Sequence, residues 1–399
     1  MWKSYLYRSY TSALKIAAKV IPMPKPTLFS GVGAVSELAG AIADLGYQRV
    51  LLVTDQGLVK VGIAQDVMES LQTFGIEVTL YSEVKPDPTY EQVEAGLSQF
   101  HANGCDAIVA LGGGSAMDCG KVIAARVTNK RSIARLAGLF RVWHAPAPLF
   151  VIPTTAGTGS EVTIAAVVSE PTNHKKTPLI DPKLVPLMAA IDPSLMVGLP
   201  PRVSAETGID ALTHAIEALV SKNALPETQA YSIAAIKLVF EHLPIVVEQG
   251  DNLESRLKMS MASYYGGLAF TKASLGYVHA ISHSLGAKYG ISHGFGNALA
   301  LLPVLRFSLP DIQSQLAKMA DVIGGEKALS EVQKADWFIA QLETLLSQFH
   351  LESRTPLIQE SDMDELIVSI LHEAHWNYPV PKFMDENDCY MVLKQIQAD

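Results

Sequence analysis

Short apolar runs alternate with amphipathic segments through the first half of the chain. RVLLVTD at 49–55, EVTLYSEV at 77–84 and DAIVALGGGS at 106–115 are separated by segments with apolar residues at helical spacing. Runs of this length and composition are typical of strands, and strands that alternate with helices form parallel sheets. The unbroken AIVAL predicts a strand that is buried on both faces. The pattern therefore predicts an α/β domain.

The pattern changes after IDPSLMVGLPP at 191–201. Long segments rich in Ala, Leu, Glu and Ser follow at helical period, and none of them resembles a strand. The sequence predicts an all-helical second half, with the boundary at Pro200 and Pro201, because proline is excluded from the interior of both kinds of element. The predicted domains are 1–21, a basic extension, 22–199, the α/β domain, and 200–399, the helical domain.

Composition narrows the class of protein. The chain has 399 residues, of which 49% are hydrophobic and 18% charged, and this indicates a two-domain globular protein. A net charge of −9 without a long basic run argues against binding to nucleic acid. Three widely spaced cysteines form no CxxC pair, so we expect neither disulfides nor a cysteine zinc site.

The cysteines and the lengths of the apolar runs also predict where in the cell the protein is located. A reducing compartment, and hence the cytoplasm, fits the cysteine usage. No apolar run reaches the roughly 20 residues of a membrane-spanning helix, and the first residues lack the pattern of a signal peptide. A helix on a membrane surface is one interpretation of the basic N-terminal segment, but we favour a frayed or self-packed extension and expect no membrane partner.

Two loops in the α/β half suit a dinucleotide. Gly112, Gly113 and Gly114 in LGGGSAMDCGK follow a buried strand and open a helix, where bare backbone N–H groups can bind a pyrophosphate. The alternative is a tight turn. The loop IPTTAGTGSE at 152–161 offers hydroxyl donors, whereas FSGVGAVSEL is only a near-miss of the dinucleotide fingerprint. Asp55 ends a strand, where it can bind an adenosine ribose or simply cap the next helix.

A carboxylate and several histidines recur in the helical half. Asp210 and His214 are four residues apart, so they share a helix face and can bind one metal or one another. His279 and His283 repeat this spacing, and His293 follows in a Gly-rich turn. A lone histidine on an apolar helix is usually a core residue, but three imidazoles and a carboxylate match the preference of zinc or ferrous iron.

These motifs together resemble the iron-containing (group III) alcohol dehydrogenases, from about residue 22 to the end. The matching segments are GGGSAMD, PTTAGTGSE, DPSLMVGLP, GIDALTHAIE, GGLAF and GYVHAISHSLG with SHGFGNALALLP. The resemblance implies a Rossmann-like dinucleotide-binding domain, a helical domain and an active site in the cleft between them. This is the architecture that the family shares with dehydroquinate synthase.

The resemblance also implies roles for individual residues. The metal ligands would be Asp210, His214, His279 and His293. His283 would relay a proton or bind the cofactor ribose, and Asp118 would lie near the nicotinamide. The glycine turn and Ser115 would hold the pyrophosphate. Thr154 and Thr155 would contact the cofactor, and Asp55 would favour NAD over NADP. We therefore expect an NAD-dependent enzyme with Fe²⁺ or Zn²⁺ that interconverts a primary alcohol and its aldehyde, as a homodimer.

The chain departs from the family pattern near the substrate. Lys272 replaces the usual Asn shortly after Phe270, a pocket residue in relatives. A cation there suggests an anionic substrate such as a sugar acid, for instance an eight-carbon 3-deoxy-octulosonate, whereas the alternative is a salt bridge to a neighbouring acid. HWNYPVPK at 375–382 replaces the family's NPR element, and Ser292 stands where proline usually precedes the last ligand.

Two other functions fit the same architecture. One is a lyase similar to dehydroquinate synthase, which uses NAD transiently. The other is a non-catalytic relative that serves as a binding module. The Asp and three His favour the dehydrogenase over both.

Overall fold

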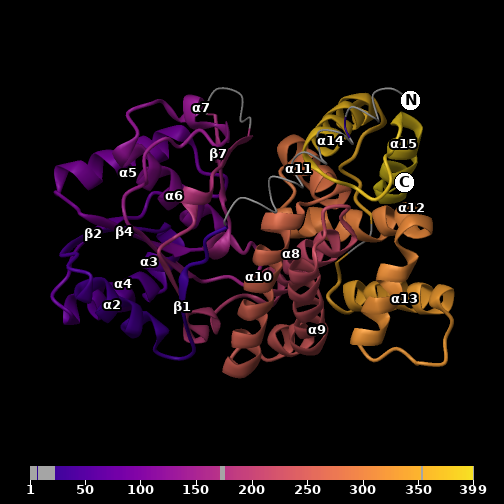
Figure 1. Ribbon diagram of the computed structural model, residues 1–399, viewed down its shortest axis with the longest axis horizontal. Helices are drawn as coiled ribbons and strands as arrows, with labels where there is room; N and C mark the ends of the chain where they lie inside the picture. The colour runs from indigo at the N-terminus through magenta and orange to yellow at the C-terminus, as the bar shows by residue number, and fades with distance from the viewer. Residues whose placement is uncertain (1–6, 8–22, 171–175, 352–353, 399) are drawn as a thin grey trace. The chain divides into compact units, whose positions relative to one another are not determined.

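The computed structural model describes residues 7, 23–170, 176–351 and 354–398. They form two compact units. The sheet unit comprises Pro22–Leu199 and Gly250–Ser260, and the helical unit comprises Pro200–Gln249 and Met261–Asp399. In Figure 1 the sheet unit is indigo to magenta, apart from Gly250–Ser260, and the helical unit runs from rose to yellow. The predicted basic extension, apart from Tyr7, lies outside the described residues.

A six-stranded parallel sheet forms the centre of the sheet unit, in the order β1-β9-β6-β4-β2-β3. Its strands are β1 (Thr27–Ser30), β2 (Arg49–Val53), β3 (Glu77–Tyr81), β4 (Ala107–Gly112), β6 (Leu149–Pro153) and β9 (Met188–Ile191). A second sheet contains β5 (Gly138–Leu139), β8 (Lys176–Ile180) and β7 (Ala165–Ser169). The prediction of an α/β domain with a parallel sheet is confirmed.

Helices cover both faces of the large sheet (Figure 1). One face packs against α2 (Ala34–Asp44) and α4 (Ile63–Thr73), and the other against α5 (Tyr90–Ala102) and α6 (Gly114–Thr128). The side chains of β4 alternate between these two cores, since Val109 joins the first and Ile108 the second. This two-sided burial explains why AIVAL contains no polar residue. The short helices of this unit are α3 (Gln56–Lys60), α7 (Ile133–Leu136), η1 (Ser160–Val162), η2 (Pro182–Leu184) and η3 (Pro193–Met196).

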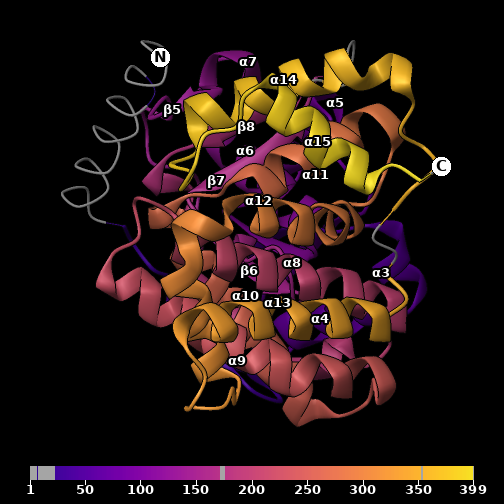
Figure 2. The same ribbon diagram turned by 90° about the vertical axis from the view of Figure 1, so that its right-hand side faces the viewer.

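The second half of the chain is helical, as predicted. Its helices are α8 (Pro201–Val220), α9 (Pro226–Glu248), α10 (Leu253–Ala273), α11 (Tyr277–Tyr289), α12 (His293–Val322), α13 (Glu331–Gln348), η4 (Glu360–Asp362), α14 (Met363–Asn377) and α15 (Glu386–Ile396). In Figure 2, α12 runs between α13 and the pair formed by α14 and α15. The first residues of α10 belong to the sheet unit.

Three local expectations differ from the structure. Pro201 is the first residue of α8, a position that tolerates proline because its missing N–H would have no partner in the helix. The sequence predicts that Gly286 and Gly290 end the helix that carries His279. Gly286 instead lies inside α11, where a Cβ would be 3.2 Å from the carbonyl oxygen of Ile291, and only Gly290 ends the helix, with a φ of 68°. His293 begins α12 and does not lie in a turn.

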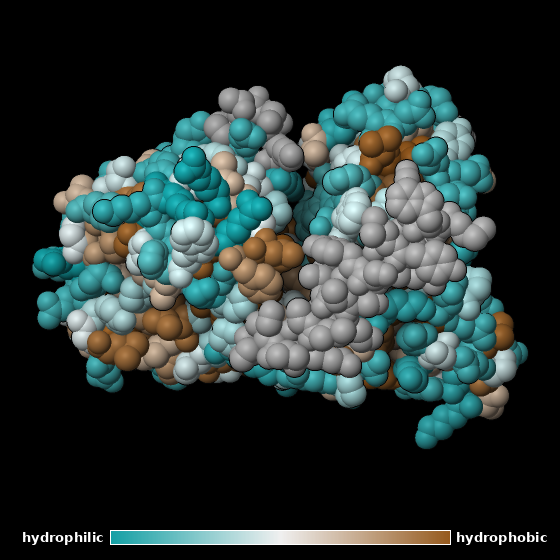
Figure 3. Space-filling model, turned by 45° about the horizontal axis from the view of Figure 1, so that its top comes forward, coloured by the Kyte–Doolittle hydropathy of each residue, from teal (hydrophilic) through white to brown (hydrophobic). Residues whose placement is uncertain are grey.

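One described helix, α9, is long and apolar enough to cross a membrane by length and composition, although the sequence predicts no such segment. Core helices pass the same test, and α9 packs against α8. Lys237 and Glu241 form an ion pair on α9 at 3.7 Å. The face shown in Figure 3 is largely hydrophilic, with scattered hydrophobic patches. Location in the cytoplasm stays a prediction.

Candidate metal centre and cofactor loops

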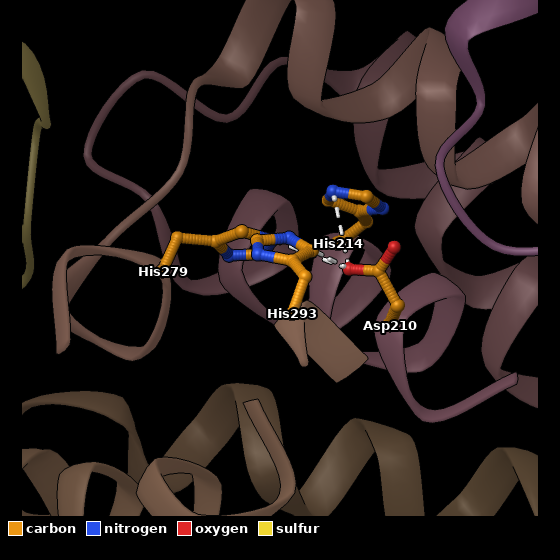
Figure 4. A group of neighbouring side chains, drawn as sticks. All are labelled: Asp210, His214, His279 and His293. Atoms are coloured by element: carbon orange, nitrogen blue, oxygen red, sulfur yellow. Dashed lines mark ion pairs between the residues drawn. The ribbon is translucent and has the colours of Figure 1, made fainter. Parts of the chain in front are cut away.

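Four side chains from three helices converge in the helical unit. Asp210 and His214 extend from successive turns of α8, His279 from α11 and His293 from the first position of α12 (Figure 4). One potential ligand atom from each lies within 4.8 Å of the other three. The four residues that the sequence singled out as ligands are therefore adjacent.

The geometry of this group fits one divalent metal ion. The Nε2 atoms of His214, His279 and His293 lie 3.7, 3.6 and 3.3 Å from Asp210 Oδ1. Nε2 of His279 is buried and has no hydrogen-bond partner among the described atoms. An unpaired polar atom in a buried site costs free energy that a metal ion at this position would recover. Three imidazoles with one carboxylate are a ligand set that iron and zinc both accept.

Glu217, which sequence analysis missed, orients His279. It lies on α8, three residues after His214, and its Oε2 is 2.6 Å from His279 Nδ1. The same carboxylate accepts hydrogen bonds from the backbone N–H groups of Gly276 and Val278. The imidazole therefore carries its proton on Nδ1, and Nε2 is free to bind a metal. Spacing on α8 was the only available signal, because Glu217 and His279 are far apart in sequence.

Hydrogen bonds and charges set the protonation of these ligands. Burial opposes the charged form of Asp210, but His214 and His293 hold its pKa well below its usual value, and Asn297 donates to its Oδ1 at 2.8 Å. Burial likewise opposes protonation of His279, but Asp210 and Glu217 raise its pKa to about 9. A metal that binds Nε2 of His279 therefore displaces a proton.

His283 lies beside the four ligands and has a different partner. Its ring stacks on His293 with centroids 5.2 Å apart, and its Nδ1 lies 2.7 Å from Glu373 Oε1. Tyr378 donates to the same carboxylate oxygen at 2.6 Å. Glu373 thus holds a proton on Nδ1 of His283 and leaves Nε2 as a proton acceptor. The sequence placed His283 near the metal but gave no sign of Glu373.

The residues next to the proposed substrate pocket are also on the helical unit. The Phe270 ring stacks on His214 at 4.3 Å, so it forms part of the wall beside the ligands. Lys272, two residues later, forms an ion pair with Glu227 of α9 at 2.6 Å. This pairing is the alternative that the sequence left open, and it removes the main argument for an anionic substrate.

The glycine turn of the sheet unit leaves no room for side chains at three successive positions. Gly112 has a φ of 146°, which favours glycine, and a Cβ there would lie 2.7 Å from Ala116 Cβ. A Cβ on Gly113 would lie 3.2 Å from Thr155 Oγ1, and one on Gly114 would lie 2.9 Å from Thr158 Cγ2. The Thr-rich loop therefore lies directly against the turn. Backbone N–H groups at the start of α6, with Ser115 in its first turn, fit a pyrophosphate.

Asp55 caps a helix and also lies next to the glycine turn. Its Oδ1 accepts a hydrogen bond from Leu58 N at 3.0 Å and so caps α3. Its Oδ2 would lie only 3.7 Å from a Cβ on Gly112, so this oxygen is next to the glycine turn. By contrast, the near-miss motif at Gly31 and Gly33 forms a turn in which Gly33 N donates to Asp192, without a sign of a ligand.

Asp118 and Lys121 connect α6 to the loop that follows β6. Asp118 accepts hydrogen bonds from Ser160 Oγ at 2.7 Å and Val167 N at 2.9 Å. Lys121 is fully buried and donates to Thr163 O, Thr163 Oγ1 and Ala165 O at 2.8 to 3.0 Å. Both oxygens of Asp118 are therefore engaged within the protein. A role for Asp118 near the nicotinamide stays a prediction.

Comparison with known families matches nearly the whole chain. Residues 25–193 match the model "Iron-containing alcohol dehydrogenase", and residues 204–396 match "Fe-containing alcohol dehydrogenase family, C-terminal".

Individual relatives agree with these matches. Alcohol dehydrogenase 4 of Schizosaccharomyces pombe is 41% identical over 83% of this chain and 81% of its own length. The NAD-dependent methanol dehydrogenase of Bacillus methanolicus is 37% identical over 92% of this chain and 97% of its own length. A crystal structure of 1,3-propanediol oxidoreductase superposes with a TM-score of 0.90 at 34% identity, covering 94% of this chain and all of that one.

Proposed function

The chain belongs to the iron-containing alcohol dehydrogenase family, and from this premise we propose that its substrates are uncharged primary alcohols and their aldehydes. Family membership makes the chain an NAD-dependent, metal-dependent alcohol dehydrogenase, as the sequence predicted. It also disfavours the lyase and the non-catalytic alternatives. The proposal therefore concerns the substrate and the tasks of individual residues.

The observation that carries the proposal is an uncharged wall beside the metal ligands. Phe270 stacks on His214, and the nearby cation Lys272 is neutralised by Glu227 at 2.6 Å. An ammonium group that already has a carboxylate partner gains little from a second anion. The relatives named for methanol and 1,3-propanediol act on small uncharged molecules with terminal hydroxyl groups. An anionic sugar acid has no comparable support.

Each chemical task falls to identifiable residues. Asp210, His214, His279 and His293 would hold the metal, and Glu217 would keep Nε2 of His279 available. A bound metal would supply a Lewis acid for the substrate oxygen, and bound NAD would supply a hydride acceptor for the carbinol carbon. His283 would accept the proton that the alcohol loses, at Nε2, while Glu373 keeps the other ring nitrogen protonated.

Binding of NAD would use the sheet unit. Gly112, Gly113, Gly114 and Ser115 would contact the pyrophosphate. Thr154 and Thr155 would contact the cofactor from the adjacent loop, and Oδ2 of Asp55 would accept a hydrogen bond from the adenosine ribose. We propose that Asp118 supports this loop through Ser160. Assembly as a homodimer is also retained as a proposal.

The test is a substrate series with enzyme loaded with Fe²⁺ or Zn²⁺. Reduced nicotinamide is followed by absorbance with methanol, ethanol, 1-propanol, 1,3-propanediol, 2-propanol and hydroxy acids. We expect kcat/KM for 1-propanol to exceed that for 2-propanol by about tenfold or more. A highest kcat/KM on 2-propanol or on a hydroxy acid would contradict the proposal.

Lys272→Met separates the two views of the substrate. If the only role of Lys272 is its ion pair with Glu227, this variant has the wild-type kcat/KM both for 1-propanol and for hydroxy acids. Loss of hydroxy-acid turnover in Lys272→Met alone would restore the anionic substrate. Glu241→Gln on α9 is the control, because its carboxylate is exposed and pairs only with Lys237 in the described structure.

A further inference from the structure

His293 differs from the other metal ligands in its exposure and its place on a helix. Its side chain is 35% exposed, whereas those of Asp210, His214 and His279 are at most 5% exposed. It is also the first residue of α12, where backbone N–H groups have no partner within the helix. Its position therefore depends on contacts from outside α12.

Ser292 provides one such contact. Its side chain does not cap α12, although it occupies the N-cap position. Its Oγ instead donates a hydrogen bond to Oε2 of Glu206 on α8 at 2.7 Å. The residue that precedes one ligand is thus tied to the helix that carries two others.

Glu206 is well placed to transmit this contact. It lies on α8 four residues before Asp210, so the two side chains share one face of the helix. Its other oxygen, Oε1, accepts a hydrogen bond from Arg202 Nε at 2.8 Å. The guanidinium of Arg202 lies 5.4 Å from the centre of the Phe295 ring, on the first turn of α12. Glu206 of α8 therefore contacts Ser292, the residue before His293, and Arg202 of α8 lies near Phe295, two residues after it.

The backbone of α12 is also in direct contact with α8 at this point. A Cβ on Gly294 would lie 2.2 Å from the carbonyl oxygen of Glu206, so only glycine permits this approach. From the opposite side, Ser282 Oγ of α11 donates to the carbonyl oxygen of His293 at 2.8 Å. The bonds that Glu206 accepts from Ser292 and Arg202 are exposed to solvent, whereas the bond from Ser282 to His293 is partly buried.

We propose that Ser292, Glu206 and Arg202 act as a latch that holds His293 against Asp210 and thereby slows release of the metal. His293 is the ligand that solvent reaches first, so it is the first that a departing metal loses. Breaking the latch lets α12 begin one residue later and lets His293 rotate away from the other three ligands. The inference rests on the metal centre and not on the identity of the alcohol.

The experiment measures release of Co²⁺ from the full-length protein into an excess of chelator. The visible absorption of bound Co²⁺ reports the coordination geometry, and its decay gives the dissociation rate without any substrate. We expect Ser292→Ala and Glu206→Ala to release Co²⁺ roughly tenfold faster than the wild type, in line with other residues that orient metal ligands. The double variant should be no faster than either single variant, because both changes break one contact.

Two further variants separate the latch from general loosening. Ser292→Thr keeps the hydroxyl and should release Co²⁺ at the wild-type rate. Ser330→Ala removes a serine that does cap its helix, α13, through Gln333 N, and so lowers stability away from the metal. The proposal would be overturned if Ser292→Ala and Glu206→Ala both released Co²⁺ at the wild-type rate. It would also be overturned if Ser330→Ala released Co²⁺ as fast as these two variants.

Discussion

Glu217 shows how a residue that contacts neither metal nor substrate can decide the state of a ligand. Its carboxylate accepts three hydrogen bonds, from His279 Nδ1, Gly276 N and Val278 N. An amide in the same place has only one accepting oxygen, so in either orientation its NH₂ group faces a donor. The carboxylate is therefore required by the geometry and not only by its charge.

Glu217→Gln should weaken metal binding by about tenfold or more, because His279 loses its fixed proton and ring orientation. Competition for Zn²⁺ with a chromogenic chelator measures the affinity. Glu241→Gln is the control and should bind Zn²⁺ like the wild type. Equal affinity in Glu217→Gln would show that His279 is held by packing alone.

The four clustered ligands were identified only through the resemblance to the family. Spacing gave a weaker local signal, since Asp210 and His214 share one helix face and His283 stands between His279 and His293 in the sequence. The partners of the histidines carry no such signal. Glu217 and Glu373 lie 62 and 90 residues from the imidazoles that they orient, and only the packing of helices brings them together.

At the scale of elements, a buried ionisable pair joins α6 to the segment that follows β6. Lys121 of α6 and Glu161 of η1 are both less than 3% exposed. Burial raises the pKa of Glu161 to about 7 and lowers that of Lys121 to about 8. Both shifts mean that burial of charge in this part of the sheet unit costs free energy.

The pH dependence of stability follows from these directions. Glu161 binds its proton more tightly when folded, so its contribution is complete below pH 4.5 and is lost as the pH rises to about 7. The difference corresponds to about 3 kcal/mol at most. Lys121 acts in the opposite direction, and its contribution grows as the pH rises from about 8 to 10.5.

The free energy of unfolding of Glu161→Gln should therefore fall less than that of the wild type as the pH rises from 4.5 to 7. The free energy of unfolding of the sheet unit, measured by urea titration across this range, tests it. Glu69→Gln replaces an exposed carboxylate on α4 and should keep the wild-type slope. Parallel slopes for wild type and Glu161→Gln would show that Glu161 does not titrate in this window.

The elements themselves were predictable where their pattern was long and regular. The buried strands β2, β4 and β6 have unbroken apolar runs, and the helical second half has helical spacing throughout. The strands β1, β5, β7, β8 and β9 were not predicted, because they are short or carry mixed polar and small residues. Pro303 and Pro310 lie inside α12, so the single helix of 30 residues could not be derived from local rules either.

At the scale of the molecule, the residues proposed to bind NAD and those that would hold the metal belong to different units. The metal ligands all lie on the helical unit, and the glycine turn and the Thr-rich loop lie on the sheet unit. A ligand that binds only the folded state stabilises the part that it contacts. NAD and the metal should therefore protect different segments from hydrogen exchange.

Exchange measured by mass spectrometry tests this division. NAD should slow exchange in β4 and α6, and Zn²⁺ should slow it in α8, α11 and the start of α12. Gly113→Ala places a methyl group 3.2 Å from Thr155 Oγ1, where it displaces a side chain proposed to contact the cofactor, and it should abolish only the effect of NAD. Gly198→Ala, whose Cβ would have no neighbour within 4 Å, should preserve both effects. Protection by NAD that persists in Gly113→Ala would place the cofactor elsewhere.

The spread of the ligands over α8, α11 and α12 also constrains the life of the newly made chain. On a ribosome, Asp210 and His214 emerge long before His293, with α9, α10 and α11 in between. Until α12 has been synthesised and has docked, only a partial and weakly binding set of ligands exists. Loading of metal is therefore a late event in maturation, which follows the docking of α12.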